Sequence, residues 1–504
     1  MELFSELMKK YPFVFVIGIL LVVTLLDFTA SADTYNLPQA DSDSRPNILF
    51  IQTDDQDARS IDAKLPNGEY VMKNARELIM KNGIRFNKNY ITLPLCCPSR
   101  STTLTGLYAH NHNIYSNDPW TGGGYPNFND TSTLPIWLQN AGYYTMHAGK
   151  YLNYYAGTKI PPGWSRWYTY WVPGLASYYN YDITNETGEK IHFGYGSENY
   201  LTDVLTNKAL EYLEQKPYGS SQFFLQLNYF APHSGWPTNK AVPADRHIGM
   251  MDNAALPMPP NFNEADVSDK PMLVKNMPLL DNDDISNITD QYRRRMESLL
   301  AVDEGIGRII SKLRQTGQYE NTIIIFTSDN GWLQGEHRFK MGKSFPYEPL
   351  QVPLIVSGPG VKKNVKSDML VGNADYSPTI LELAHATAGL PQDGISFAPL
   401  LSNPDGQGIS WRNDYLIEIS KDDTGLRVQD KDNKREYLYM EYNYDNDTIA
   451  DERELYAFMP DDCVKRGDPY QLESQHNNTC YIGLIKQFHD RLARLKDCVG
   501  DECH

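Results

Sequence analysis

Apolar segments with the length of β-strands alternate with helix-like segments over most of this chain. The strand-like segments are residues 46–53, 84–91, 143–147, 223–229, 322–328, 352–356 and 369–371, and the helix-like segments are residues 72–82, 134–141, 202–215, 288–315 and 378–388. Strands that alternate with helices tend to pair in parallel and to be covered on both faces. The pattern predicts an α/β fold with a large, mostly parallel mixed sheet sandwiched by helices. Ligands of such sheets bind beyond the carboxyl ends of the strands.

The pattern changes near residue 405. Short strand-like runs at 414–420, 436–442 and 454–458 precede a helix-like segment at 481–496. Most of the cysteines also lie here: Cys463, Cys480, Cys498 and Cys503. An oxidising compartment would pair them, most simply as Cys463–Cys480 and Cys498–Cys503. We expect a main domain at 46–404, with a long surface loop at 253–284, and a small antiparallel α+β subdomain at 405–504 that contains the cysteine cluster.

The N-terminus has the features of an export signal. Residues 13–26 form the long apolar run of the chain, preceded by Lys9 and Lys10 and followed by small residues at 30–32. This run is short for a bilayer span and suits the core of a signal peptide. We expect a signal peptide at 1–32, a polar leader at 33–45 and no stable membrane span. The alternative is an uncleaved membrane anchor.

Glycosylation motifs agree with export. Asn-X-Thr acceptors occur at Asn129, Asn185, Asn287, Asn446 and Asn477. Each motif alone is weak, but five of them behind a signal peptide predict a glycoprotein of the secretory pathway that meets the glycosylation machinery. Its destination would be the extracellular space or the lysosome.

The charge of the chain excludes some partners. The formal net charge is −17 and the sequence pI is near 5.1. The basic run at residues 293–295 lies on an expected helix, where we interpret it as a solvated face. Nucleic acid is therefore not an expected partner. A long sulfated polymer bound along a basic surface is also disfavoured, whereas a single sulfated sugar end could enter a local cationic pocket.

Residues 96–106, Cys-Cys-Pro-Ser-Arg-Ser-Thr-Thr-Leu-Thr-Gly, place a thiol at the start of an expected helix. Pro98 suits a first helical turn and Gly106 suits a helix end. The free N–H groups and the dipole of a helix N-terminus attract anions. The segment therefore predicts a reactive group beside an anion-binding turn. The alternative is a buried pair of structural cysteines.

Acidic residues follow two of the expected strands. Asp54 and Asp55 come after the strand at 46–53, and Asp329 and Asn330 come after the strand at 322–328. Gathered carboxylates repel one another unless a cation lies between them, and oxygen ligands suit a hard divalent ion such as Ca²⁺. An isolated Asp-Asp pair would more often be a solvated turn, but the two pairs together predict a metal site.

Three cations and a histidine complete the candidate site. Arg100, Lys150 and Lys343 could neutralise the peripheral oxygens of a sulfate monoester while its S–O bond breaks. His233, after an apolar strand, is the candidate acid for the leaving alcohol. Either lysine taken alone would be a surface lysine, and His233 taken alone could be a strand-end histidine that makes a structural hydrogen bond. The weaker candidates are His147, His110 and His112.

The chain resembles the type I, formylglycine-dependent sulfatases. The resemblance rests on Cys96-x-Pro-Ser-Arg followed by Leu-Thr-Gly, and on Thr53-Asp-Asp-Gln, Gly149-Lys-Tyr-Leu-Asn, Ala231-Pro-His-Ser, Ser328-Asp-Asn-Gly and Gly335-Glu-His-Arg. It covers residues 46–400 well and the C-terminal part loosely. Within the family these runs are most similar to the N-acetylglucosamine-6-sulfatases. Gly123-Gly124-Tyr125-Pro126 and the run that starts at Leu134 also resemble secreted arylsulfatases of fungal type.

The resemblance implies an alkaline-phosphatase-like fold and a set of roles. The formylglycine-generating enzyme would convert Cys96 to formylglycine (3-oxoalanine) during export. Calcium would bind Asp54, Asp55, Asp329, Asn330 and the modified Cys96, while Arg100, Lys150, His233 and Lys343 would bind and polarise the sulfate. One position departs from many arylsulfatases, because Leu152 stands where they have a histidine. His147 is a candidate substitute.

The expected function is hydrolysis of sulfate monoesters by a formylglycine nucleophile. The expected substrate is the 6-sulfate of N-acetylglucosamine in glycosaminoglycans, taken by exo attack. One alternative is an arylsulfatase that acts on aryl or other small sulfate esters. Two further alternatives are a catalytically silent protein that binds sulfated glycans and a phosphomonoesterase of the same superfold. The latter usually has two metals, whereas this sequence offers ligands for one.

Overall fold

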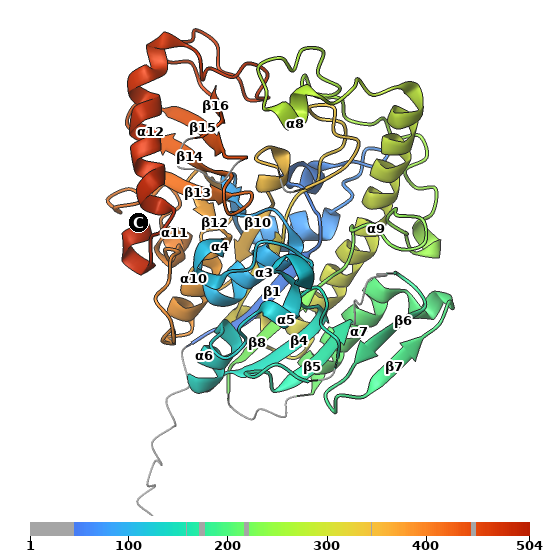
Figure 1. Ribbon diagram of the computed structural model, residues 1–504. Helices are drawn as coiled ribbons and strands as arrows, with labels where there is room; N and C mark the ends of the chain where they lie inside the picture. The colour runs from blue at the N-terminus through green and yellow to red at the C-terminus, as the bar shows by residue number, and fades with distance from the viewer. Residues whose placement is uncertain (1–44, 158, 171–176, 216–220, 344, 445–449) are drawn as a thin grey trace, which may run out of the picture. The chain divides into compact units, whose positions relative to one another are not determined.

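The structure is a computed structural model that describes residues 45–504 except 158, 171–176, 216–220, 344 and 445–449 (Figure 1). The predicted signal peptide, almost all of the predicted leader and the acceptor Asn446 lie outside the described residues. Among the residues described, no helix is long and apolar enough to cross a membrane.

A ten-stranded mixed sheet forms the centre of the fold, in the order β11-β2-β10-β9-β1-β8-β4-β5-β6-β7. The parallel part consists of β9 (Thr322–Ser328), β1 (Asn47–Thr53), β8 (Phe223–Asn228), β4 (Tyr144–Lys150) and β5 (Arg166–Tyr170). Antiparallel pairs join β10 (Leu354–Ser357) to β9 and to β2 (Gly83–Phe86), and join β6 (Tyr181–Thr184) to β5 and to β7 (Lys190–Phe193). β11 (Val365–Ser367) is parallel to β2. The predicted fold class is confirmed.

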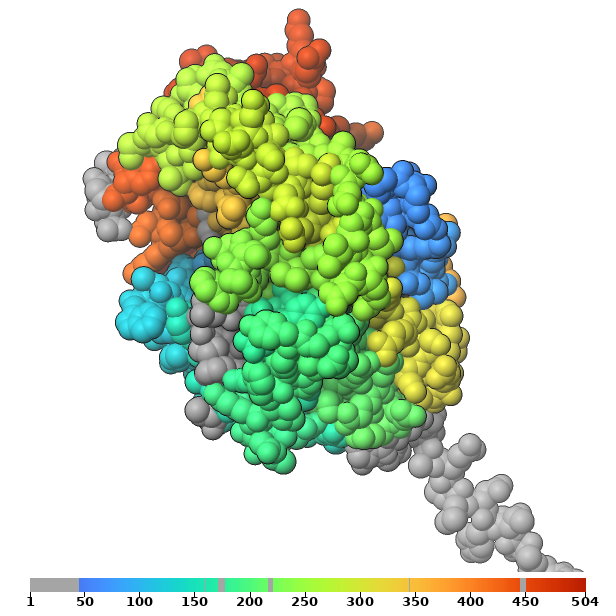
Figure 2. All heavy atoms as spheres, turned by 90° about the vertical axis from the view of Figure 1, so that its right-hand side faces the viewer, coloured from blue at the N-terminus to red at the C-terminus, as the bar shows by residue number. Residues whose placement is uncertain are grey.

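Helices cover both faces of this sheet, because successive side chains of a strand point to opposite faces. Leu49 and Ile51 of β1 belong to a core shared with α7 (Leu201–Glu214) and α9 (Asn282–Gln315). Ile48 and Phe50 belong to a second core shared with α3 (Cys96–Thr105), α6 (Leu134–Asn140) and α10 (Tyr376–Leu383). Figure 2 views the side of α9, where the green to yellow segments form much of the surface seen.

Short elements connect these layers. They are η1 (Ala58–Asp62), the π-helix η2 (Ala75–Ile79), η3 (Met80–Asn82), α4 (Ala109–His112), η4 (Pro119–Thr121), α5 (Gly124–Asn127), η5 (Ser197–Asn199), η6 (Asp245–His247), α8 (Met272–Lys275), η7 (Tyr319–Asn321), η8 (Glu348–Leu350), η9 (Asn373–Asp375), α11 (Ala398–Ser402), η10 (Thr479–Tyr481) and η11 (Gly500–Cys503). A separate two-stranded sheet pairs β3 (Asn89–Tyr90) with β12 (Val371–Gly372).

Near the C-terminus a four-stranded antiparallel sheet runs in chain order: β13 (Asp414–Glu418), β14 (Thr424–Asp430), β15 (Arg435–Tyr442) and β16 (Glu452–Ala457). The amphipathic helix α12 (Ile482–Leu495) packs on it through Phe488, Leu492 and Leu495. Strand β14 was not predicted, because the charged Arg427 interrupts its apolar pattern. In the structure the Arg427 guanidinium lies over the ring of Phe458, 3.6 Å from the ring centroid.

Several other predictions need correction. The single strand expected at 84–91 is two strands in different sheets, because the chain leaves β2 after Phe86 and pairs again only at Asn89. The strand expected at 369–371 begins at Val371, in the two-stranded sheet. The loop expected at 253–284 contains α8, and β5, β6 and β7 were not predicted. The interpretation of residues 293–295 as a solvated face is wrong for Arg295, whose side chain is fully buried.

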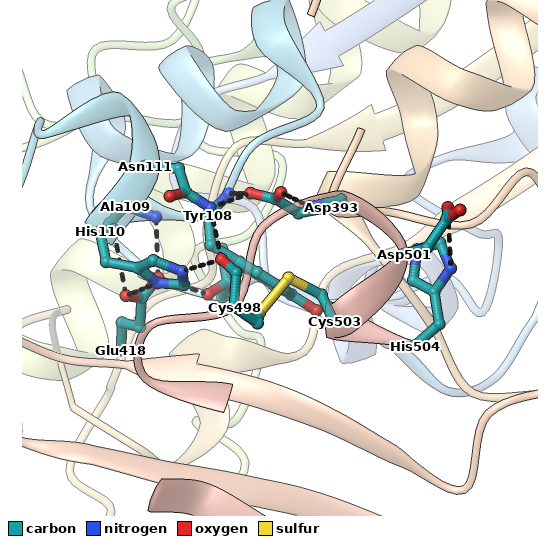
Figure 3. Close-up of a disulfide and its surroundings, with 12 residues drawn as sticks. Tyr108, Ala109, His110, Asn111, Asp393, Glu418, Cys498, Asp501, Cys503 and His504 are labelled. Carbon is teal, nitrogen blue, oxygen red and sulfur yellow. Dashed lines mark hydrogen bonds and ion pairs between the residues drawn. A yellow bond between two sulfur atoms is a disulfide. The ribbon is translucent and has the colours of Figure 1, made fainter. Parts of the chain in front are cut away.

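The predicted disulfides Cys463–Cys480 and Cys498–Cys503 are both present. The second one closes a loop that contacts α4 (Figure 3). The carbonyl of Cys498 accepts hydrogen bonds from His110 Nε2 at 2.9 Å and Asn111 Nδ2 at 2.8 Å. The C-terminal end of the chain is thereby attached to the segment that follows α3.

Candidate active site

The polar residues of the site follow the carboxyl ends of neighbouring parallel strands. Thr53 at the end of β1 is paired with Ser328 at the end of β9, so Asp54 and Asp329 leave the sheet side by side. β4 ends at Lys150, and β8 leads toward His233. Because these strands are parallel, their carboxyl ends lie at one edge of the sheet. The fold therefore brings together residues that are up to 288 positions apart, as in the contact between Lys343 and Asp55.

The helix α3 presents Cys96 to this edge. Leu95 is extended, Cys96 is the first helical residue, and the helix ends at Gly106, whose φ of 71° favours glycine. The Ser99 hydroxyl donates a hydrogen bond of 2.5 Å to the carbonyl of Asp329, which ties the first helical turn to the end of β9. The predicted start and end of this helix are confirmed.

Cys96 lies between a carboxylate and an ammonium group. Its Sγ is 3.4 Å from Asp54 Oδ1 and 2.8 Å from Lys343 Nζ. Burial first, and then the charge of Asp54, raise the pKa of the Cys96 thiol to about 12. The neighbouring Cys97 is also fully buried and belongs to the apolar core on the α3 face of the sheet. The two cysteines therefore have different surroundings, and Cys96 alone faces the polar cluster.

Three cations pair with the carboxylates of the site. Lys150 Nζ contacts Asp54 Oδ2, and Lys343 Nζ lies 2.5 Å from Asp55 Oδ1. Arg100 donates from Nε to Asp329 Oδ2 at 2.8 Å. Burial alone would raise the pKa of the Asp54 carboxyl, but the surrounding cations, Lys150 first, outweigh burial and lower that pKa. Burial and the charge of Asp54 raise the pKa of Asp329 to about 6.

His233 is the partly exposed member of the cluster, with 22% of its side chain accessible. Its Nδ1 lies 2.6 Å from the carbonyl of Ser234, and its Nε2 lies 3.6 Å from Asp55 Oδ2. Nδ1–H donates to that carbonyl, so Nε2 faces the site. Burial lowers the pKa of His233 more than the charge of Asp55 raises it, so the ring is neutral near pH 7.

The oxygen atoms at this edge fit a hard cation. Ligand atoms of Asp54, Asp55, Cys96 and His233 all lie within 4.8 Å of one another. Asp55 Oδ2 and Asn330 Oδ1 are buried and have no hydrogen-bond partner. The Asn330 amide donates from Nδ2 to Asp55 Oδ1 at 2.7 Å, which leaves its own oxygen free. Buried oxygens without partners are costly, and a metal ion would satisfy them.

The weaker histidine candidates lie outside this cluster. His147 is fully buried, with Nδ1 2.9 Å from Thr169 Oγ1 and Nε2 3.3 Å from the Asn228 amide. Asn228 in turn donates to the carbonyl of Lys150 at 2.9 Å. Both ring nitrogens thus have protein partners, and His147 supports the end of β4 instead of taking the place of a histidine at Leu152. His110 and His112 contact Glu418 and Thr102, respectively.

Two residues at the site were missed by the sequence analysis. Arg295 donates hydrogen bonds to the carbonyls of Asp55 and Pro232. Trp332 directly follows Asn330-Gly331, and its ring lies 5.7 Å from Lys343 Nζ. The sequence signal for Arg295 is its place in the helical period, three residues after Tyr292 and four before Leu299, which puts it on the apolar face of α9.

Comparison with known proteins agrees with this geometry. The family model described as Sulfatase matches residues 46–386, and the model described as N-sulphoglucosamine sulphohydrolase, C-terminal, matches residues 335–497. The Volvox carteri arylsulfatase is 30% identical over 544 aligned residues, which cover 96% of this chain and 79% of that protein.

Two further relatives are longer than this chain. A Caenorhabditis elegans protein described as an extracellular sulfatase Sulf-1 homolog is 34% identical, and the match covers 92% of this chain and 62% of that protein. The Capra hircus N-acetylglucosamine-6-sulfatase is also 34% identical, and the match covers 74% of this chain and 66% of that protein. The chain therefore spans slightly less than two thirds of these two relatives.

Solved structures share the fold over nearly the whole chain. A protein in complex with its substrate D-glucosamine-2-N,6-O-disulfate is 25% identical with a TM-score of 0.70, covering 89% of this chain and 97% of that chain. The phosphonate monoester hydrolase of Agrobacterium radiobacter has a TM-score of 0.63 at 17% identity, covering 90% of this chain and 95% of that chain, and this likeness concerns the fold alone. The family models, the relatives and the fold agree: the chain belongs to the sulfatase family.

Proposed function

We propose that this protein is a sulfatase that hydrolyses sulfate monoesters to an alcohol and inorganic sulfate. The observation that carries the proposal is the position of Cys96, which is the first residue of α3 and lies between Asp54 and Lys343. A buried thiol with a pKa near 12 is a poor nucleophile near pH 7. Conversion of Cys96 to formylglycine would supply an aldehyde hydrate, whose hydroxyl oxygen is the nucleophile toward sulfur.

We assign the metal to calcium, with Asp54, Asp55, Asp329 and Asn330 as its protein ligands beside residue 96. Bound there, Ca²⁺ would supply positive charge for the sulfate oxygens. Arg100, Lys150 and Lys343 surround the same position and add their charges. Together they stabilise the charge that develops on the sulfate as the S–O bond breaks.

His233 is the proposed acid for the leaving alcohol. The Nδ1–H bond to the Ser234 carbonyl fixes the ring and directs Nε2 into the site. A bound sulfate ester adds negative charge next to the ring and raises its pKa, so Nε2 takes up a proton. The protonated ring can then donate this proton to the departing oxygen. His233 is also the most exposed member of the cluster, which places it where a leaving alcohol can reach solvent.

The proposed substrate is the 6-sulfate of N-acetylglucosamine at the end of a glycosaminoglycan chain. The resemblance to N-acetylglucosamine-6-sulfatase and the glucosamine-6-O-sulfate group in the ligand of one structural neighbour support this choice. The net charge of −17 disfavours long-range attraction of a polyanion, which supports exo attack. At contact distance the local cations dominate, so a single sulfate can still enter.

An arylsulfatase is the second candidate. It is favoured by the Volvox carteri enzyme, whose match covers almost the whole chain. We further propose that the protein is exported as a glycoprotein, is modified by the formylglycine-generating enzyme, and acts in the extracellular space or the lysosome. The acceptors Asn129, Asn287 and Asn477 are exposed, as glycosylation requires. We also retain the proposed division into domains at 46–404 and 405–504.

The test measures sulfate release from three substrates: 6-sulfated N-acetylglucosamine or an oligosaccharide that ends in it, intact heparin with internal sulfates, and nitrocatechol sulfate. We expect the first to turn over fastest. Faster release from internal sulfates would contradict exo attack, and turnover of the aryl sulfate alone would favour the arylsulfatase. Peptide mass spectrometry should find the aldehyde on residue 96. A protein that bound sulfated glycans but released no sulfate would be a catalytically silent binder.

A further inference from the structure

A fully buried guanidinium lies behind the acidic edge of the sheet, which is the group formed by Asp54, Asp55, Asp329 and Asn330. Arg295 is in the middle of α9 and has no accessible surface. Among the residues that the structure describes, no carboxylate lies within 4.0 Å of its nitrogens, and its Nε has no hydrogen-bond partner. A buried charge without a direct counterion is costly, so the position needs an explanation beyond helix packing.

The hydrogen bonds of Arg295 go to two backbone carbonyls at the site. Nη1 donates to the carbonyl of Pro232 at 3.2 Å, and Nη2 donates to the carbonyl of Asp55. Pro232 directly precedes His233, and Asp55 carries a proposed metal-binding carboxylate. A planar guanidinium presents its donors in a fixed fork, so it can join two carbonyls at a set separation. A lysine ammonium lacks this geometry.

The guanidinium of Arg295 holds the backbone at Asp55 in an unusual conformation. Asp55 has a φ of 68°, in the left-handed region that non-glycine residues adopt rarely. This conformation directs the chain away from the end of β1, and such strained positions persist only where their surroundings fix them. The hydrogen bond from Arg295 to the Asp55 carbonyl is one such constraint. Burial lowers the pKa of Arg295, and the charge of Asp55 acts against that change.

Trp332 connects the same guanidinium to Lys343. Its ring centroid lies 5.4 Å from Arg295 Cζ and 5.7 Å from Lys343 Nζ, and its side chain is buried. Arg295 and Lys343 thus both contact the indole of Trp332. Each cation gains from the negative face of the ring.

We propose that Arg295 is a positioning residue for the sulfatase reaction: it joins the Asp55 and Pro232 carbonyls and thereby sets the separation between the metal-binding carboxylate of Asp55 and the ring of His233. It touches neither substrate nor metal. This inference rests on the proposed roles of Asp55 and His233. Residues that orient metal ligands in this indirect way typically change metal affinity or activity by about 10–100-fold when they are replaced.

The experiment compares Arg295→Met, Arg295→Lys and the matched control Arg294→Met in the full-length purified protein. Arg294 is on the same helix, but it pairs with Asp290 at 3.0 Å and 42% of its side chain is exposed. Calcium titration of metal-depleted protein by calorimetry is the first readout. The second readout is kcat and KM separately, and the third is the melting temperature with and without Ca²⁺.

We expect both Arg295 variants to bind Ca²⁺ about 10–100-fold more weakly and to lose more in kcat than in KM, whereas Arg294→Met stays within about twofold of wild type. Wild-type calcium affinity and kcat in a folded Arg295→Met would overturn the proposal. Wild-type calcium affinity and kcat in Arg295→Lys would also overturn the proposal, because they would show that a positive charge is sufficient and the planar guanidinium is not needed. If both Arg295 variants failed to fold while Arg294→Met folded, the role would be purely structural. A wild-type protein that bound no Ca²⁺ would refute the metal assignment, and the kcat comparison would still decide the role of Arg295.

Discussion

The acidic edge of the main sheet and the C-terminal disulfide loop both bury carboxylates, but they satisfy them differently. Around the disulfide, Asp393 accepts hydrogen bonds from Asn111 Nδ2 and from the backbone N–H groups of Tyr108 and Gly500, each at 2.8 Å (Figure 3). Glu418 likewise accepts from the backbone and ring of His110. At the acidic edge, Asp55 Oδ2 and Asn330 Oδ1 have no partner.

This difference distinguishes buried carboxylates that stabilise the fold from buried carboxylates that can bind a ligand. Carboxylates that accept from several backbone N–H groups, as Asp393 and Glu418 do, stabilise one conformation of the chain around them. Carboxylates with unpaired buried oxygens are costly unless a ligand satisfies them, and such groups cluster at functional sites. The disulfide loop therefore fixes the segment that follows α3, while the acidic edge remains available for chemistry.

The largest expected effect distinguishes the two buried cysteines of α3. Cys96→Ala removes the proposed nucleophile and should lower kcat by about four orders of magnitude or more, with little change in fold. Cys97→Ala removes only a packed side chain and should retain most of the activity. The measurement is sulfate release at matched protein concentration, with circular dichroism to verify folding. Comparable activity in the two variants would remove Cys96 from the mechanism.

The comparison of carboxylates can be tested with one substitution in each region. Asp329→Asn should weaken calcium binding and lower kcat by about 10²–10³-fold, because a ligand charge and the partner of Arg100 are lost. Asp393→Asn should instead cost about 1–3 kcal/mol of unfolding free energy, because it leaves buried N–H groups poorly paired, and should leave kcat nearly unchanged. Chemical denaturation measures the stability of both variants, and steady-state kinetics measures their kcat. A loss of kcat in Asp393→Asn but not in Asp329→Asn would contradict the assignment of the two carboxylates.

Acid should destabilise the protein through His147. Burial lowers the pKa of this ring to about 3, below its ordinary value of 6.5. The unfolded chain therefore binds more protons than the folded chain between these values, so the free energy of unfolding falls as the pH drops from 6.5 toward 3. Between pH 6.5 and 4.5 the loss would be about 2–3 kcal/mol.

Thermal melts at a series of pH values test this expectation. His147→Gln, which cannot become charged, should show a shallower decline over this range, even if it is less stable at pH 7. An unchanged slope would mean that His147 is not the group responsible.

The smallest expected effect on kcat concerns the two disulfides. Loop-closure entropy predicts that loss of Cys463–Cys480, with a sequence separation of 17, costs about 3 kcal/mol, and that loss of Cys498–Cys503, with a separation of 5, costs about 2 kcal/mol. Serine variants of each pair, compared by denaturant titration, measure both values. Neither pair should alter kcat by more than a few-fold. A large loss of kcat in Cys498→Ser/Cys503→Ser alone would show that the loop around His110 influences the chemistry.

The sequence was sufficient where the signal is local. Residues 47–53 and 322–328 are fully buried on both faces and therefore form continuous apolar runs, which is how both strands were recognised. The start of α3 at Cys96 and its end at Gly106 follow from the residues themselves. Asp54, Asp55, Asp329 and Asn330 became candidate ligands because they directly follow these two strands. Strand β7 gave no comparable signal, since Lys190–Phe193 is largely exposed.

Arg295 marks the limit of sequence reasoning in this protein. The helical period places Arg295 on the apolar face of α9, between Tyr292 and Leu299, but it does not show which polar atoms the guanidinium meets there. Arg295 reaches carbonyls that are 63 and 240 positions away in the chain, whereas Arg294 pairs with Asp290 one turn earlier. By itself the sequence determined the class of fold, made the observed cysteine pairing the simplest one and named the candidate residues for the chemistry. Only the tertiary structure decided which buried charges are paired and which arginine supports the site, because those choices depend on contacts between segments distant in the chain.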